Sequence, residues 1–351
     1  MTTLHAPEAW PTNTLVWLRR MLPGLALSAL VAVLALAGAP WIAKVFPIPA
    51  MVIALLIGIA LNPIAQREWF QPGIVFCLKT LLRWAVALLG LRIALGDIAA
   101  LGSLSAALVI VSMAVTVFAG FLLARAFGQR AEYGALAGAG TAVCGASATL
   151  ATAIVVPDYK GKEADVAFVV VAVNALSTIA MVLYPVICAS LGFEPQHTGV
   201  MLGATIHDVA QVVGAGYAVS EPVGNTAVIV KLFRVFLLFP VVIAIGWWFA
   251  GASAAADAGK IPIPVFALVF VVLSILNSLA SSFAPVAPVF AQIKAPLIEI
   301  STWGLLIAIS ALGLGTSLPA IAGLGWRHIA TVTGTTIVIL AVATAGLLLM
   351  H

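Results

Sequence analysis

The chain has 351 residues, of which 63% are hydrophobic and only 8% are charged, and its net charge is +4. Because soluble domains carry about 25% charged residues, this composition excludes an ordinary soluble enzyme. The small positive charge does not indicate nucleic-acid binding, since most Lys and Arg residues lie at the ends of apolar runs. The sequence therefore predicts an all-α polytopic membrane protein.

The apolar runs predict about 9–11 helical segments, separated by polar or Pro/Gly-containing breaks such as 157–162. Arg19 and Arg20 precede the first run, which we interpret as a retained helix rather than a cleaved signal peptide. A short Ala/Gly/Ser linker is expected at 251–260, and no soluble domain is expected within 1–351. The runs lie at about 22–39, 47–62, 74–96, 101–123, 133–156, 164–188, 197–218, 225–250, 261–281, 297–318 and 328–350.

An internal duplication is indicated by two patterns that recur in the same order. The spacing from Pro47 to Asn62, within FPIP…N, equals the spacing from Pro262 to Asn277 within IPIP…N. Further on, the Gly-Leu pair at 90–91 and the pair at 313–314 are followed by Leu, Ile, Leu and Gly at identical spacings. We therefore predict that residues 22–123 form one repeat, that 225–350 form a second, and that 133–218 form a central part.

Two glycine-rich segments lie in the predicted central part. Residues 134–147 read GALAGAGTAVCGAS, and residues 199–211 begin with the similar GVMLGA and contain His207 and Asp208. Glycine disfavours a helix interior, and irregular backbone at membrane depth is tolerated only where it faces protein or a water-filled cavity. We predict that both helices are interrupted, either as broken spanning helices or as re-entrant segments, and that they line a binding site.

The distribution of Lys and Arg favours the re-entrant arrangement. If each glycine-rich segment enters and leaves on the same side, Lys160 and Lys162 lie inside, and only Lys44 and Lys294 remain outside. The N-terminus is then cytoplasmic, and the two segments enter from opposite faces as an inverted pair. Such pairs are the best sequence indication of a transporter binding site.

Ionisable residues inside the predicted spans are costly and usually functional. His207 and Asp208 are candidates for proton coupling, and the alternative is a structural clamp that holds the interruption to a neighbouring helix. Gln211 follows one turn later and is a candidate ligand. Asn174 is expected to form a hydrogen bond within the helical bundle.

Lys231 and Arg234 lie on one face of their predicted helix, and three interpretations remain open for them. They can pair with Asp208, supply positive charge to an anion site, or snorkel to the interface, as we expect for Arg92. Cations outnumber carboxylates at depth, and interrupted helices expose N–H groups that attract anions. The sequence therefore favours a small anion as substrate, with ligands from Gly140, Thr141, Cys144, Gly145, Ser147 and Thr205.

Four stretches closely resemble the YeiH family of bacterial inner-membrane proteins, which are described as sulfate exporters. These stretches are AGAGTAVCGASA (137–148), KEADVAFVVVAVNALSTIAM (162–181), GATIHDVAQVVGAG (203–216) and KLFRVFLLFPVV (231–242). The resemblance covers about 20–350 and implies a carrier of sulfate or sulfite in the bacterial cytoplasmic membrane. It also implies kinship with the inverted-repeat folds of bile acid symporters and sodium/proton antiporters.

The function that we predict is export of a small oxidised sulfur anion by a secondary active transporter. The alternatives are a sodium- or proton-coupled organic anion carrier and, with less support, an anion channel. The sequence contains no P-loop, no HExxH motif and no G-x-S-x-G elbow around Ser147, so we expect neither an enzyme nor a cofactor or metal. The expected partners are the anion, a proton or sodium ion, membrane lipid and a second copy of the chain in a homodimer, with no nucleic acid.

Overall fold

The computed structural model describes residues 14–42, 50–93, 96, 101–250, 265–283, 287–316 and 325–350, and its regular elements in these ranges are all helical. Seven of the described helices are long and apolar enough to cross a membrane. This confirms the prediction of an all-α polytopic membrane protein. The seven are Trp17–Ile42, Gln71–Leu91, Gly102–Ala126, Lys162–Ser190, Glu221–Phe249, Ala287–Gly315 and Trp326–Met350.

The chain divides into two compact units, and the first consists of Met1–Trp84 with Trp303–Ser317. Its core residues come from α1 (Thr14–Ile42), α3 (Asn62–Ala65), α4 (Gln71–Phe76), η1 (Cys77–Leu81) and the last turns of α16 (Ala287–Gly315). Val31, Ile74, Cys77 and Leu314 are all buried. Its elements are α1 Thr14–Ile42, α2 Ala50–Ala60, α3 Asn62–Ala65, α4 Gln71–Phe76, the π-helix η1 Cys77–Leu81 and the end of α16 Ala287–Gly315.

The second unit consists of Ala85–Thr302 with Leu318–His351. It holds most of α5 Leu82–Leu88, the 3₁₀ helix η2 Leu89–Leu91, the beginning of α16, and the remaining helices. These are α7 Gly102–Ala126, α8 Ala131–Ala142, α9 Ala146–Val155, α10 Lys162–Ser190, α11 Pro195–Thr205, α12 Val209–Val219, α13 Glu221–Phe236, α14 Leu238–Ala250, α15 Val265–Ser282 and α18 Trp326–Met350. α10 carries Glu163 and Asp165 in its first turn, where carboxylates suit the positive end of the helix.

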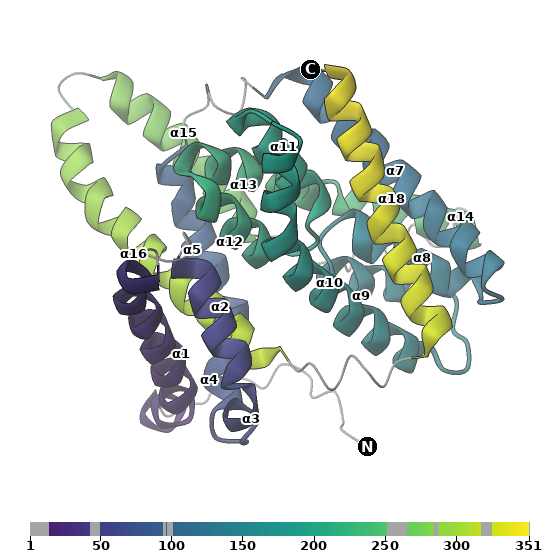
Figure 1. The fold of residues 1–351 in the computed structure, drawn as a ribbon, viewed down its shortest axis with the longest axis horizontal. Helices are drawn as coiled ribbons and strands as arrows, with labels where there is room; N and C mark the ends of the chain where they lie inside the picture. Colours follow the sequence, from purple (N-terminus) through teal and green to yellow (C-terminus); the bar gives the residue numbers. More distant parts are fainter. Residues whose placement is uncertain are drawn as a thin grey trace. The chain divides into compact units, whose positions relative to one another are not determined.

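α18 lies antiparallel to α7 along most of its length (Figure 1). A Cβ on Gly334 would lie 2.7 Å from Leu123, and one on Gly346 would lie 2.2 Å from Leu108. Along the same α18, the backbone of His328 accepts a bond from Tyr133 of α8, and Thr344 near the other end contacts Met201 of α11. α18 therefore passes α8 first and α11 last.

Both glycine-rich segments contain a short gap between two helices. α8 ends at Ala142 and α9 begins at Ala146, while α11 ends at Thr205 and α12 begins at Val209. Gly145 precedes α9 with φ of +66°, a left-handed conformation that glycine adopts at no steric cost. Asp208 precedes α12 and caps it, because its side chain accepts the N–H of Ala210 at 2.8 Å.

Part of the predicted repeat pattern lies outside the described residues. This applies to the proline-rich openings at 46–49 and 261–264, to the linker at 251–260, and to most of the spacing pattern after the two Gly-Leu pairs. Asn62, Asn277 and both Gly-Leu pairs lie within the described residues.

Candidate functional site

The two interruptions meet each other in the second unit. Lys231 of α13 donates through Nζ to the carbonyl of Val143 at 2.6 Å and to that of Ile206 at 3.0 Å, so that one ammonium group joins both gaps. His207 also joins them, since its Nδ1 lies 3.2 Å from the carbonyl oxygen of Thr141. Lys231 and His207 are both fully buried.

Arg234 lies one turn after Lys231 and uses its guanidinium group in the same way. Its Nε and Nη2 donate to the carbonyl of Ala142 at 3.0 and 2.7 Å, and Nη2 also donates to that of Thr141 at 3.0 Å. Its Nη1 donates to the carbonyls of Gly203 and Ile206 at 2.9 and 3.0 Å. A guanidinium group has five N–H donors, so every donor of this buried side chain meets a backbone oxygen.

These contacts have a direct physical cause. The last carbonyls of a helix have no partner within the helix, and the C-terminal end carries about −0.5 charge. α8 and α11 both end inside the protein, where unsatisfied carbonyls are costly. Lys231 and Arg234 satisfy the carbonyls of both ends and neutralise both partial charges.

The N-terminal sides of the two gaps differ from each other. Asp208 caps α12, and its backbone N–H donates to Ser177 Oγ of α10 at 3.1 Å. By contrast, α9 follows Gly145, which has no side chain to cap it, and begins with Ala146 and the exposed Ser147. The N-terminus of α9 therefore begins without an N-cap side chain, close to two buried cations.

Two amides lie next to Asp208. Gln211 of α12 donates through Nε2 to Asn174 Oδ1 of α10 at 3.0 Å, which confirms the predicted role of Asn174 in the bundle. Gln211 is fully buried, and among the described residues its Oε1 has no hydrogen-bond partner. This part of the site thus offers oxygen ligands from Asp208, Asn174, Gln211 and Ser177.

The remaining predicted ligands are two hydroxyl groups, a glycine and a thiol. Thr141 Oγ1 contacts Thr335 Oγ1 of α18 at 2.9 Å, and Thr205 Oγ1 donates back to the carbonyl of Met201 at 2.6 Å, so both hydroxyls are internal. Gly140 faces Thr149, since a Cβ there would lie 2.5 Å from its hydroxyl. Cys144 lies in the gap as a buried free thiol, with only 7% of its surface exposed.

The gaps also contact α18, through two adjacent hydroxyls. His207 Nε2 lies 3.0 Å from Thr336 Oγ1, next to the contact between Thr335 and Thr141. α18 thus touches α8 through Thr335 and the segment between α11 and α12 through Thr336. Within the described residues, no group of three or more His, Cys, Asp or Glu side chains is arranged to hold a metal ion.

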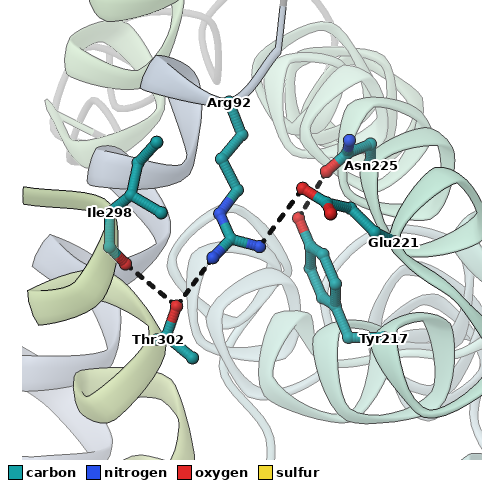
Figure 2. A network of polar contacts seen from close by, with 6 residues as sticks. All are labelled: Arg92, Tyr217, Glu221, Asn225, Ile298 and Thr302. Carbon is teal, nitrogen blue, oxygen red and sulfur yellow. Dashed lines mark hydrogen bonds and ion pairs between the residues drawn. The ribbon is translucent and has the colours of Figure 1, made fainter. Parts of the chain in front are cut away.

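A second polar network joins the start of α13 to α16 (Figure 2). Arg92, which follows η2, donates to Glu221 Oε1 at 3.4 Å and to Thr302 Oγ1 at 2.8 Å. Its guanidinium carbon lies 5.9 Å from the centre of the Tyr217 ring, and Tyr217 donates to Asn225 Oδ1 at 2.6 Å. Arg92 therefore has defined protein partners, and the snorkelling that we expected from its position near the end of an apolar run stays a prediction.

A third polar cluster lies at the start of α18. His328 Nε2 lies 3.3 Å from Asp165 of α10, and Tyr159 also donates to Asp165 at 3.0 Å. Arg130, just before α8, lies 5.6 Å from the ring centre of Tyr159, which follows α9. In the same loop, the hydrogen bond from Lys162 lowers the pKa of Asp158.

Comparison with known proteins identifies the family. The family described as "Conserved hypothetical protein 698" matches residues 23–332. The UPF0324 membrane protein TauZ of Paracoccus pantotrophus is 42% identical over 332 residues, which cover 93% of this chain and 95% of the relative.

The chain belongs to the UPF0324 family of membrane proteins. A UPF0324 membrane protein of Chlorobaculum tepidum is 39% identical over 93% of this chain and 89% of its own length. The UPF0324 inner membrane protein YeiH of Escherichia coli K12 is 36% identical over 87% of each chain. The resemblance to the YeiH family is thereby confirmed, and the names of these relatives agree with a multi-pass membrane protein.

In this UPF0324 protein, sequence reasoning missed the residues that reach the gaps from far along the chain. Thr335 and Thr336 read as ordinary small residues of a membrane helix, and no local pattern marks them. Glu221 follows the N-cap Ser220, whose Oγ accepts the N–H of Val223, so its position at a helix start was recognisable. Its contact with Arg92 was not recognisable from the sequence, because the two residues are 129 positions apart in the chain.

Proposed function

We propose that this UPF0324 protein is a secondary active transporter that exports a small oxidised sulfur anion, sulfate or sulfite, by alternating access. The observation that carries the proposal is the meeting of two interrupted helices at Lys231 and Arg234, beside a helix start whose N-cap residue is Gly145. Interrupted helices of this kind form the substrate sites of many transporters.

The contacts at the ends of each pair support re-entrant segments rather than spanning ones. Arg130 precedes α8 and lies against Tyr159, which follows α9. A Cβ on Gly199, in the first half of α11, would lie 3.0 Å from the carbonyl of Val223, in the first turn of α13 after α12. These contacts support a common membrane level for the beginning and the end of each pair.

The order of contacts along α18 supports entry from opposite faces. α18 meets α8 at His328, both gaps at Thr335 and Thr336, and α11 at Thr344. At 1.5 Å per residue, the distance from the first to the last of these positions is about 24 Å, most of the thickness of a bilayer core. The two gaps then lie near the bilayer midplane, and the Lys- and Arg-rich end with His328 is cytoplasmic. A cytoplasmic N-terminus is proposed separately, from the same charge rule applied to Arg19 and Arg20.

Matched hydrogen bonds support the proposed duplication. Asn62 Nδ2 donates to the carbonyl of Leu314 at 2.7 Å in the first unit, and Asn277 Nδ2 donates to that of Ile93 at 3.2 Å in the second. Each asparagine thus binds the backbone at or just after the Gly-Leu pair of the other repeat. The two glycines of these pairs match as well, because a Cβ on Gly313 would lie 2.3 Å from Leu55 O, and one on Gly90 would lie 2.2 Å from Phe270 O.

The charge balance favours an anion. The partial charges of the two helix C-termini, about −0.5 each, are offset by those of the two N-termini, about +0.5 each. Asp208 offsets one of the two buried cations, which leaves about one positive charge near α9. Ser147 and the first N–H groups of α9 are placed to receive the compensating anion.

Uptake by proteoliposomes tests this function. Vesicles with the purified protein are offered sulfate, sulfite, thiosulfate and small sulfonates, each with and without a pH gradient. We expect saturable flux of at least one sulfur anion, and its loss in Asp208→Asn, because the neutral side chain weakens the α12 cap and the charge balance. Asp158→Asn, in an exposed loop, is the matched control. Absence of flux for every anion would refute the proposal.

The group of oxygen atoms near Asp208 favours one second candidate, a sodium-coupled carrier of an organic anion. Asn174, Gln211 and Ser177 supply the neutral oxygens, and the unpartnered Oε1 of Gln211 is one of them. A sodium requirement together with competition by carboxylates would favour this candidate over sulfur anion export. The alternative coupling ion is a proton, for which transport would depend on a pH gradient and not on sodium.

A further inference from the structure

The imidazole of His207 is held by two groups of different hydrogen-bonding character. The carbonyl of Thr141 can only accept, so Nδ1 carries a proton in that 3.2 Å contact. Thr336 Oγ1, 3.0 Å from Nε2, can either donate or accept. The partner at Nε2 is thus the one that adapts when the imidazole gains or loses a proton.

Thr336 has a second acceptor within reach, since its Oγ1 lies 2.9 Å from the carbonyl of Val332 one turn earlier in α18. When His207 is neutral, the hydroxyl hydrogen points to the lone pair of Nε2. When His207 is protonated, Nε2–H donates to Thr336 Oγ1, and the hydroxyl hydrogen turns to Val332. Both states keep the same heavy-atom positions and satisfy every donor.

The surroundings determine which state is favoured. The charged groups that act on His207 are Lys231 and Arg234 of α13. Asp208 follows His207 directly in the chain, the Cys144 thiol lies in the facing gap, and α18 meets this region through the neutral hydroxyls of Thr335 and Thr336. With two cations against one carboxylate, a further positive charge is opposed. An anion bound beside α9 would offset that charge, so that proton and anion bind together.

We propose that Thr336 is the positioning residue of a proton-coupling pair with His207, and that one proton accompanies the anion. This inference rests on the proposed function for its anion, while the proton switch itself rests on the hydrogen bonds. In the switch, the lone pair of Nε2 takes a proton from a hydronium ion, which is left as a water molecule, and the hydroxyl hydrogen of Thr336 rotates from Nε2 to the Val332 carbonyl. The N–H bond formed and the O–H bond broken in hydronium are the only covalent changes.

Thr336→Val is the informative variant, because it keeps the shape of the side chain and removes the hydroxyl. Sulfate or sulfite is added to proteoliposomes that contain a trapped pH indicator. We expect anion-dependent proton uptake to fall about tenfold in the variant, the factor that a lost hydrogen bond to a charged group carries. Anion exchange without net proton movement should fall less, and Thr336→Ser should restore proton uptake.

Thr344→Val is the matched control, since Thr344 lies on the same helix and contacts Met201 Sδ at 3.9 Å, away from His207. Proton uptake should be unchanged in this control. Equal proton uptake by wild type and Thr336→Val would overturn the inference, as would anion flux in wild type without any proton movement.

Nitrogen NMR of the histidine rings in lipid decides the switch without transport, with His207→Gln to assign the signals. Wild type should show neutral His207 with the proton on Nδ1 at high pH and a doubly protonated ring at low pH, whereas Thr336→Val should resist protonation. A ring that stays unchanged across the titration, or titrates identically in the variant, would overturn the inference. If no anion is transported but this titration is observed, the proposed function fails and the proton switch stands.

Discussion

At the scale of single residues, the main feature is two buried cations whose contacts are helix ends. Lys231 and Arg234 are fully buried and bind carbonyls at the ends of α8 and α11. Two C-terminal partial charges of about −0.5 suffice to balance one full positive charge. These side chains therefore fix the geometry of the gaps. In our proposal they attract an anion through their positive charge and do not bind it directly, because their hydrogen-bond donors are used by carbonyls.

Arg234→Lys should destabilise the protein although it keeps the charge. Lysine has three donors and lacks the planar fork, so that carbonyls among Thr141, Ala142 and Gly203 lose their partners. We expect the free energy of unfolding to fall by about 3 kcal/mol, since each unsatisfied buried group costs about 1–3 kcal/mol. Thermal unfolding of the purified protein in detergent measures the effect.

The control for this change is Arg83→Lys, which alters an exposed arginine in the first unit. It should leave the unfolding temperature nearly unchanged. If both variants unfold at the temperature of the wild type, the carbonyl contacts of Arg234 contribute no stability, and our interpretation of its role is wrong.

At the scale of helices, the packing depends on positions where two backbones come too close for a side chain. Gly313 of α16 faces α2, and a Cβ there would lie 2.3 Å from the carbonyl of Leu55 and 2.9 Å from the Cα of Gly58. Small residues allow such contacts between membrane helices, where dispersion forces and hydrogen bonds replace the hydrophobic effect.

Gly313→Ala should therefore disrupt the first unit. The added methyl group meets backbone atoms, which cannot rotate away, so we expect a loss of about 1–3 kcal/mol or a failure to accumulate in the membrane. Gly38→Ala is the matched control, since its nearest neighbour would be a side-chain atom of Ile42 at 3.9 Å. Equal expression and equal unfolding temperatures for the two variants would contradict the prediction.

Helix α13 illustrates a weaker contact at its start. The side chain of Glu221 is 63% exposed and that of Arg92 is 20% exposed, so their ion pair at 3.4 Å is largely solvated. We expect Glu221→Gln to change the unfolding free energy by less than about 1 kcal/mol. Arg92→Gln should have a larger effect, because it also weakens the contacts to Thr302 and the Tyr217 ring. A larger loss in Glu221→Gln would reverse this ranking.

At the scale of the whole molecule, the arrangement across the membrane is the property that most constrains function. α18 passes α8, the two gaps and α11 in that order. Positively charged residues gather near the first turn of α18: Arg327 lies in that turn, Arg130 precedes α8, and Lys160 follows α9. We therefore predict that this end of α18 lies in the cytoplasm and that the α10–α11 turn lies outside.

Cysteine labelling in intact cells tests this topology. The three native cysteines are buried and should react little with a membrane-impermeant maleimide. Glu194→Cys, at an exposed position in the α10–α11 turn, should be labelled, whereas the exposed Lys160→Cys should be labelled only after the membrane is permeabilised. The reverse pattern would invert the topology and, with it, the inferred direction of export.

Much of the candidate site was predictable from local sequence. Glycines in an apolar run mark the gap before α9, and His207 and Asp208 mark the gap before α12, because their effects on the backbone act within a few residues. The assignment of all these residues to substrate or coupling stays a prediction. Sequence could not show that Arg234 commits all its donors to carbonyls, since its partners lie up to 93 residues away.

The sequence by itself determined that this is a polytopic helical membrane protein, where the interruptions lie and to which family it belongs, because apolar length, glycine content and family motifs are local properties. Only the tertiary structure decided that the two gaps meet, that Lys231 and Arg234 join them, and that Thr336 of α18 holds His207. The physical reason is that a buried carbonyl, cation or imidazole is costly unless it is hydrogen-bonded. Which residue supplies that hydrogen bond depends on which side chains the fold brings within reach, and local sequence does not show this.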